Sequence, residues 1–225
     1  MLSFWDPEAE APVPELTSLY ATGEALWALA LLHNTWPDEG WDAPARRTLT
    51  YMATDRDEDE DVWPKPWADQ WAAYSLHEMA AWGLDDVHTD YARRLAGQWG
   101  VATRWESQRN GGIDGLVHAP ENVAAGQGTW MEGLGMLRQL AVIDERLEDI
   151  ENDLGDRLLC GAGRMIAKQK RNTGQTEVDG GFFVDGTTRV DGQQHVLSGL
   201  IFAERVLESR ASAEDEADSQ GENDT

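Results

Sequence analysis

Apolar residues recur at three- and four-residue intervals along most of the chain, and convincing runs of strict alternation are missing. The first spacing places residues on one face of an α-helix, whereas alternation is typical of a β-strand. Helices are therefore predicted over residues 18–34, 43–55, 67–82, 87–107, 121–142, 144–170 and 190–208. The segments between them are rich in Gly, Pro, Asp and Trp, which favours loops. The pattern predicts an all-α fold.

The predicted helices alternate in character along the chain. One type is apolar on most faces and contains small residues such as Ala28, Gly135 and Gly199, which closely packed inner helices need. The other type keeps a charged face, marked by residues such as Arg46 and Arg93, as expected of outer helices. Inner helices are predicted at 18–34, 67–82, 121–142 and 190–208, and outer helices at 43–55, 87–107 and 144–170.

A weak internal repeat accompanies this alternation. The inner helices open with the pairs Gly23-Glu24, Asp69-Gln70, Gly126-Gln127 and Gly192-Gln193, and a leucine lies seven or eight positions after the first residue of each pair. Two loops also match each other, "NGGIDGLVHAPENVAAGQGTW" and "DGGFFVDGTTRVDGQQHV", since both place Gly-Gly, an Asp and a His before or at the start of an inner helix. The repeat indicates a helical hairpin that recurs along the chain.

This combination of helix order and opening pairs resembles the (α/α) toroid group, in which outer and inner helices alternate around a ring. The group includes six-hairpin glycosidases, N-acylglucosamine and uronyl epimerases, unsaturated-glycan hydrolases and terpenoid cyclases. The resemblance covers about residues 15–208. Because a closed ring of six hairpins needs twelve helices and the chain is predicted to have seven, we expect a partial or open toroid. A homodimer partner, a second chain or a longer enzyme would complete the ring.

The resemblance implies that the loops leading into the inner helices share one end of the ring and line a common mouth. Acid–base chemistry is then expected from Asp69, Asp114, His118, Asp191 and His195, and substrate binding from Tyr20, Glu24, Trp63, Trp67, Gln70, Gln127, Arg189 and Gln193. Carboxylates and imidazoles transfer protons, and aromatic faces stack on sugar rings. Acids at helix starts are also favoured as caps, so a structural role stays open for Asp69 and Asp191.

The eleven tryptophans fit either a binding surface or a core. Trp63 lies in a predicted loop and is the better candidate for stacking on a ligand. Trp27, Trp71, Trp82 and Trp99 lie within predicted helices and are expected in the core, where aromatic side chains are usually buried.

The net charge of the chain argues against some classes of binding partner. The 225 residues include 42 acidic and 18 basic ones, for a formal charge of −24, which repels nucleic acid and anionic membranes, so neither is expected as a partner. The abundance of acids and the shortage of lysine resemble proteins of salt-accumulating halophiles, because concentrated salt screens self-repulsion. High-GC codon bias is the alternative. The N-terminus shows no basic and apolar leader, so a cytoplasmic location is expected.

Domain limits and cofactors follow from composition and motifs. Residues 1–208 are expected to form the helical domain, and residues 209–225, which lack aromatics and are rich in acidic and small polar residues, are expected to be a disordered tail. Cys160 is the single cysteine, so the chain has no internal disulfide. The sequence has neither a phosphate-binding glycine loop nor an HExxH motif, and no cofactor or metal is expected.

Three functions are compatible with these features. The first is a hydrolase, epimerase or lyase acting on a sugar or glycan through carboxylate and histidine acid–base chemistry. The second is a non-catalytic helical-repeat binding module, or a subunit of a larger toroid. The third is a terpenoid-cyclase-like enzyme, which the tryptophans favour and the polar loops oppose.

Overall fold

The computed structural model describes residues 5–13, 18–63, 65–107, 124–183 and 186–223. Its α-helices are α1 (Ala21–Thr35), α2 (Asp42–Thr54), α3 (Arg56–Asp59), α4 (Gln70–Met79), α5 (Asp86–Ser107), α6 (Ala124–Ile143), α7 (Glu151–Lys168) and α8 (Val190–Asn223). Three short 3-10 helices are η1 (Pro37–Glu39), η2 (Ala80–Trp82) and η4 (Glu145–Ile150). Strands β1 (Trp5–Asp6) and β2 (Ala11–Pro12) form an antiparallel hairpin. The predicted all-α class is confirmed.

The helix ends depart from the predicted ends where a side chain caps the backbone. Helix α4 begins at Gln70 rather than residue 67, because the Asp69 carboxylate accepts a hydrogen bond from the backbone N–H of Trp71 at 3.0 Å. The predicted helix 144–170 is divided into η4 and α7. Asp144 caps the first piece by accepting from the N–H of Arg146 at 3.1 Å.

The contacts between the long helices define two rows. In the first row, α1, α4, α6 and α8 contact one another in chain order. In the second row, α5 contacts both α2 and α7. Each helix of the second row also packs against two consecutive helices of the first, since α2 contacts α1 and α4, α5 contacts α4 and α6, and α7 contacts α6 and α8. The first row contains the helices predicted to be inner, and the second row those predicted to be outer.

Glycines set the spacing around α6. A Cβ atom on Gly128 would lie 2.6 Å from the backbone nitrogen of Val196 on α8. One on Gly135 would lie 2.5 Å from the Phe202 side chain, and one on Gly133 would lie 2.5 Å from Trp99 on α5. Such distances are too short for real atoms, so α6 can approach both neighbours this closely only with glycine at these positions.

The core lies between the two rows. Trp99 has no exposed surface, as predicted, and contacts α6 from α5. The same core cluster contains buried apolar side chains of both rows, among them Leu49 of α2, Leu76 of α4 and Leu134 of α6. Trp27, Trp71 and Trp82 are half-buried, and of these Trp82 packs against the core as predicted.

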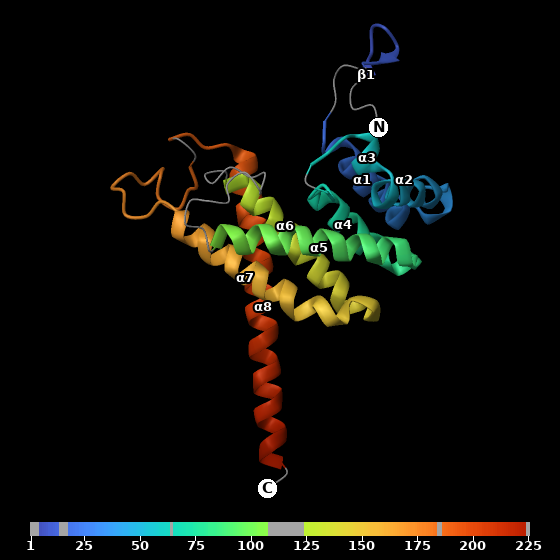
Figure 1. The fold of residues 1–225 in the computed structure, drawn as a ribbon. Coiled ribbons are helices and arrows are strands. Elements are labelled where there is room, and N and C mark those ends of the chain that lie inside the picture. The colour runs from blue at the N-terminus through green and yellow to red at the C-terminus, as the bar shows by residue number, and fades with distance from the viewer. Residues whose placement is uncertain (1–4, 14–17, 64, 108–123, 184–185, 224–225) are drawn as a thin grey trace.

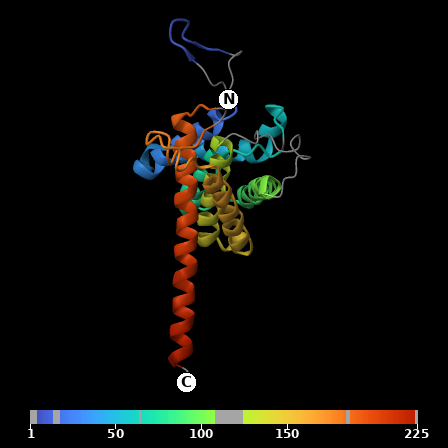
Figure 2. The same ribbon diagram turned by 90° about the vertical axis from the view of Figure 1, so that its left-hand side faces the viewer.

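Helix α8 is the longest helix described and extends beyond the rest of the molecule, at the end opposite the N-terminal hairpin (Figures 1 and 2). The sequence predicted disorder from residue 209, whereas the structure continues the helix to Asn223. Ala and Glu, which are strong helix formers, recur in this segment, so the helix can continue there without burial. Within the described residues, neither α8 nor any other helix combines the length and apolarity required to cross a membrane.

Replacing Gly128 with Ala should lower the free energy of unfolding by about 1–3 kcal/mol, because the added methyl group forces α6 away from α8. Gly163→Ala on α7 is the matched control. It meets no atom within 4 Å and should raise the free energy of unfolding by about 0.5–1 kcal/mol through helix propensity. Chemical denaturation followed by tryptophan fluorescence measures both, and shifts of the same sign would contradict the close-packing argument.

Candidate functional site

A carboxylate and an imidazole meet where α6 packs against α8. Glu132 of α6 is 1% exposed, and its Oε2 atom lies 2.7 Å from Nδ1 of His195 on α8. The close approach that Gly128 allows, one turn before Glu132, brings these two helices near enough for the contact. The His195 side chain retains 12% exposure. The pair therefore has a buried acidic end and an accessible imidazole.

Two further polar side chains adjoin the Glu132 carboxylate. Gln194 donates from Nε2 to Glu132 Oε1 at 3.2 Å, and the hydroxyl of Tyr74 on α4 lies near the same carboxylate. The pKa of Tyr74 is raised above its ordinary value by burial and then by the Glu132 charge. Tyr74 therefore keeps its proton. With these partners in place, the carboxylate is fixed to receive the Nδ1 proton of His195.

This arrangement has a defined chemical capacity. When Nδ1–H of a neutral imidazole donates to a carboxylate, Nε2 is left as the free base and can accept a proton from a ligand. The buried carboxylate also stabilises the imidazolium that forms, so the same nitrogen can return the proton. The Glu132–His195 pair can thus act as a reversible proton carrier.

Aromatic rings from three helices of the first row adjoin the pair. Trp27 of α1 stacks on Trp71 of α4, with ring centroids 5.0 Å apart and an angle of 26° between the planes. The Trp71 ring lies edge-on to His195 at 6.5 Å. Tyr74 bridges the group, since its ring lies 5.2 Å from Trp27 and 6.4 Å from Phe202 of α8. Two half-buried indoles, stacked on each other, thus lie beside the Glu132–His195 pair.

Sequence reasoning identified His195 but missed Glu132, Tyr74 and Gln194. A signal for Glu132 was available in "GTWMEGL", where one acidic residue stands inside an otherwise apolar helix. An isolated acid at such a position must be paired or pay a large desolvation cost. Its partner could not be named without knowing that α6 packs against the start of α8.

Asp69 belongs to a buried ion pair and not to an accessible site. It is fully buried, and its Oδ2 atom accepts from Arg56 Nη1 at 2.7 Å. Burial raises the pKa of Asp69 to about 6, against the opposing charge and hydrogen bond of Arg56. A Cβ on Gly23 of α1 would lie 2.4 Å from the same carboxylate. Since Asp69 has no exposed surface, we leave it out of the proposed site.

Arg56 extends this network across three segments. Its side chain is also fully buried and donates from Nε to Glu60 Oε2 at 3.1 Å and from Nη2 to the carbonyl oxygen of Leu19. Glu60 in turn accepts from Thr22 Oγ1 and from the Tyr51 hydroxyl, each at 3.3 Å. Arg56 and its partners thereby tie α3 to the beginnings of α1 and α4.

Other predicted binding residues lie around this network. The Tyr20 ring lies 6.0 Å from the Trp67 ring, so these two are neighbours. Glu24 and Trp63 are exposed. Gln70 is 2% exposed, with an Oε1 atom that has no hydrogen-bond partner among the described residues, and Gln127 is 4% exposed. The burial of Asp69, Gln70 and Gln127 does not fit the expected common mouth.

The polar residues at the start of α8 contact one another or the loop that precedes the helix. Arg189 and Asp191 form an exposed ion pair of 2.8 Å. Gln193 donates to the carbonyl oxygen of Phe182 and accepts from the N–H of Phe182 at 3.2 Å. Gln193 therefore fastens the loop before α8, which accounts for its place at the helix start. Asp114 and His118 lie outside the described residues.

Within the described residues, no cluster of three or more His, Cys, Asp or Glu side chains is arranged to hold a metal ion. Comparisons of the chain with protein-family models, curated proteins and solved structures found no match. The Glu132–His195 pair and its aromatic neighbours thus rest on geometry alone.

Asp69→Asn should lower the free energy of unfolding by about 3 kcal/mol at pH 7.5, because it leaves the buried Arg56 guanidinium without its closest anion while keeping a cap for α4. Asp191→Asn is the control, since it removes an ion pair in which Arg189 is 82% exposed. We expect it to change stability by less than about 1 kcal/mol. Denaturation curves compare the two, and equal losses would show that Asp69 and Arg56 are not a structural centre.

Proposed function

We propose that the chain is a carbohydrate-active protein in which the Glu132–His195 pair moves a proton on a sugar or glycan bound against Trp27 and Trp71. The observation that carries the proposal is the 2.7 Å contact between a buried carboxylate and an accessible imidazole, set beside two stacked indoles. Indole faces suit the apolar faces of sugar rings, and the imidazole Nε2 suits a hydroxyl or an acidic C–H group.

The reaction class follows from how the two acid–base groups are arranged. Glycoside hydrolysis uses two carboxyl groups that both face the scissile bond. Glu132 is instead buried behind His195, so the pair presents a single nitrogen to a ligand. A single positioned base suits a reaction that removes a proton from the substrate, with or without returning it afterwards. We therefore favour an epimerase or a lyase over a hydrolase.

The two helix rows support a partial (α/α) toroid as the scaffold. In this proposal α1, α4, α6 and α8 are the inner layer, and α2, α5 and α7 are the outer layer. Residues of the site come from all four helices of the first row: Trp27, Trp71, Tyr74, Glu132, His195 and Phe202. The charge of −24 supports assays in concentrated salt, as for a halophilic protein.

A non-catalytic glycan-binding module is the second candidate. The stacked Trp27 and Trp71 rings favour it, because such a surface binds a sugar ring without any chemistry. The two candidates differ in what His195 does. In an enzyme its loss abolishes turnover and largely spares binding, whereas in a binding module no variant turns over a ligand.

A glycan array probed in multimolar KCl provides the test. Glycans that bind are then incubated with the protein in D2O and followed by NMR for deuterium incorporation, inversion or elimination. We expect His195→Gln to reduce turnover at least ~100-fold and to change binding only a few-fold. Trp71→Ala should weaken binding about tenfold through the loss of stacking.

Trp36→Ala is the matched control for Trp71→Ala, since Trp36 is 52% exposed and lies at the start of η1, in the loop between α1 and α2. Thermal unfolding verifies that each variant is folded. Absence of binding to every glycan by the unaltered protein would overturn the carbohydrate proposal. Binding without turnover would leave the binding module.

A further inference from the structure

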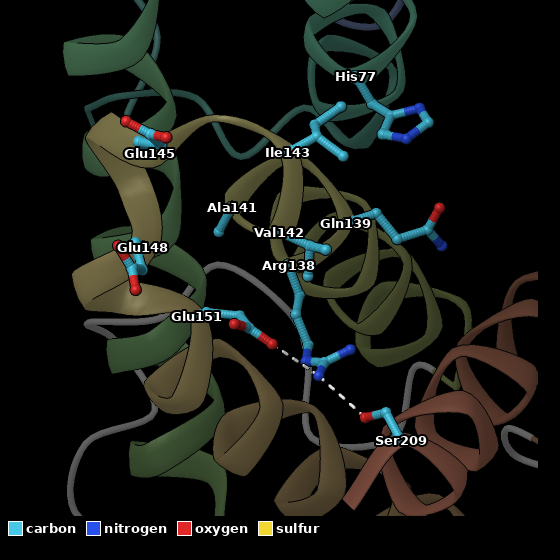
Figure 3. A pocket seen from close by; sticks show the side chains of 10 residues that line it. All are labelled: His77, Arg138, Gln139, Ala141, Val142, Ile143, Glu145, Glu148, Glu151 and Ser209. Atoms are coloured by element: carbon cyan, nitrogen blue, oxygen red, sulfur yellow. Dashed lines mark hydrogen bonds and ion pairs between the residues drawn. The ribbon is translucent and has the colours of Figure 1, made fainter. Parts of the chain in front are cut away.

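A groove of about 600 Å³ opens at the C-terminal end of α6 (Figure 3). It is bounded by residues of α4, α6, η4, α7 and α8, and His195 is not among them. Val142 and Ile143 form an apolar lip and are 59% and 58% exposed. Glu145 and Glu148 of η4 lie on the opposite wall. The groove thus combines exposed apolar side chains with negative charge.

The charge of the groove is left largely uncompensated. Its cation, Arg138, is already engaged, since Nη2 lies 2.8 Å from Glu151 Oε1 and 3.0 Å from Ser209 Oγ. Figure 3 shows these bonds at the foot of the groove, away from Glu145 and Glu148. Neither of those carboxylates has an ion-pair partner among the described residues. An occupant with basic side chains beside an apolar one would match this groove.

The same chain carries a segment with that chemistry. Residues 157–176 contain no Asp or Glu and hold five of the 18 basic residues, in a chain that has 42 acidic ones. At the end of α7 this stretch exposes Ile166, which is 45% exposed, followed by the exposed Lys170 and Arg171. Backbone hydrogen bonds between Lys170 and Gly180 and Gly181, of 2.8 and 2.9 Å, hold the segment in place.

The basic segment cannot reach the groove of its own molecule. The groove adjoins Glu151, the first residue of α7, whereas Ile166, Lys170 and Arg171 lie in or just after its last turn. Eighteen helical residues separate these ends by about 27 Å. A contact between the two surfaces must therefore join different molecules.

We propose that the basic segment around Ile166, Lys170 and Arg171 of one copy docks in the groove of a second copy. The occupant is argued from charge, because in a chain of −24 an acid-free segment that carries five basic residues complements an acidic groove of a second copy. Ile166 would pack on Val142 and Ile143, while Lys170 and Arg171 would pair with Glu145 and Glu148. Such a contact joins unlike surfaces, so it builds a closed ring or an open chain of copies.

Charge reversal tests the proposal by sedimentation equilibrium at low KCl concentration, where exposed charges are least screened. Glu145→Lys with Glu148→Lys, or Lys170→Glu with Arg171→Glu, should each lower the association constant at least about tenfold, because like charges then face each other. Mixing the two variants should restore association, since each reversed surface then meets its complement. A chain with all four substitutions should associate with itself.

Glu8→Lys with Glu10→Lys is the control for the Glu145 and Glu148 reversal, since it changes the charge by the same amount at two residues that are exposed on the N-terminal hairpin. It should leave association unchanged, and circular dichroism establishes that every variant is folded. A monomeric unaltered protein at ~100 µM would overturn the proposal. So would association that survives either reversal, or that the mixture fails to restore, because another surface or a foreign basic partner would then be responsible.

Discussion

The candidate site depends on how closely α6 approaches α8. Gly128, Gly135 and Gly199 lie at this contact, where a Cβ on any of them would fall within 2.7 Å of the opposite helix. Only at this separation can a side chain as short as that of Glu132 reach the imidazole of His195 while remaining buried. The close packing of α6 on α8 is therefore also what brings the carboxylate to the imidazole. The glycines of α6 are as much a part of the site as the residues that would touch a ligand.

A second constraint operates at the opposite end of the first row. There the buried Arg56 guanidinium joins Asp69, Glu60 and the backbone of Leu19. Burying such charges is costly, so a hydrophobic cluster of equal volume could be as stable. The charged group contributes geometric specificity, because the planar guanidinium can donate all of these hydrogen bonds in only one relative orientation of the three segments that it bonds. The start of α4, and with it Trp71 and Tyr74, is positioned by that arrangement.

Local sequence signals predicted the helices well and the chemistry less well. Apolar periodicity located α1, α2, α5 and α6 within a few residues, since it depends only on which face is buried. Asp69 and Gln193 were assigned to chemistry because polar residues at helix starts serve ligands and backbone equally well. Distinguishing these roles requires the partners, Arg56 and Phe182, which lie 13 and 11 residues away in the chain. Glu132 was missed because its partner lies 63 residues away.

The length of α8 has a consequence for how the protein behaves in solution. About 15 residues beyond Glu208 continue as helix, which corresponds to roughly 22 Å of rod extending from the body. A rod of this kind raises hydrodynamic friction much more than it raises mass. The 25.0 kDa chain should therefore elute early from a sizing column even when it is alone. Its Stokes radius alone would suggest a heavier particle than the one present.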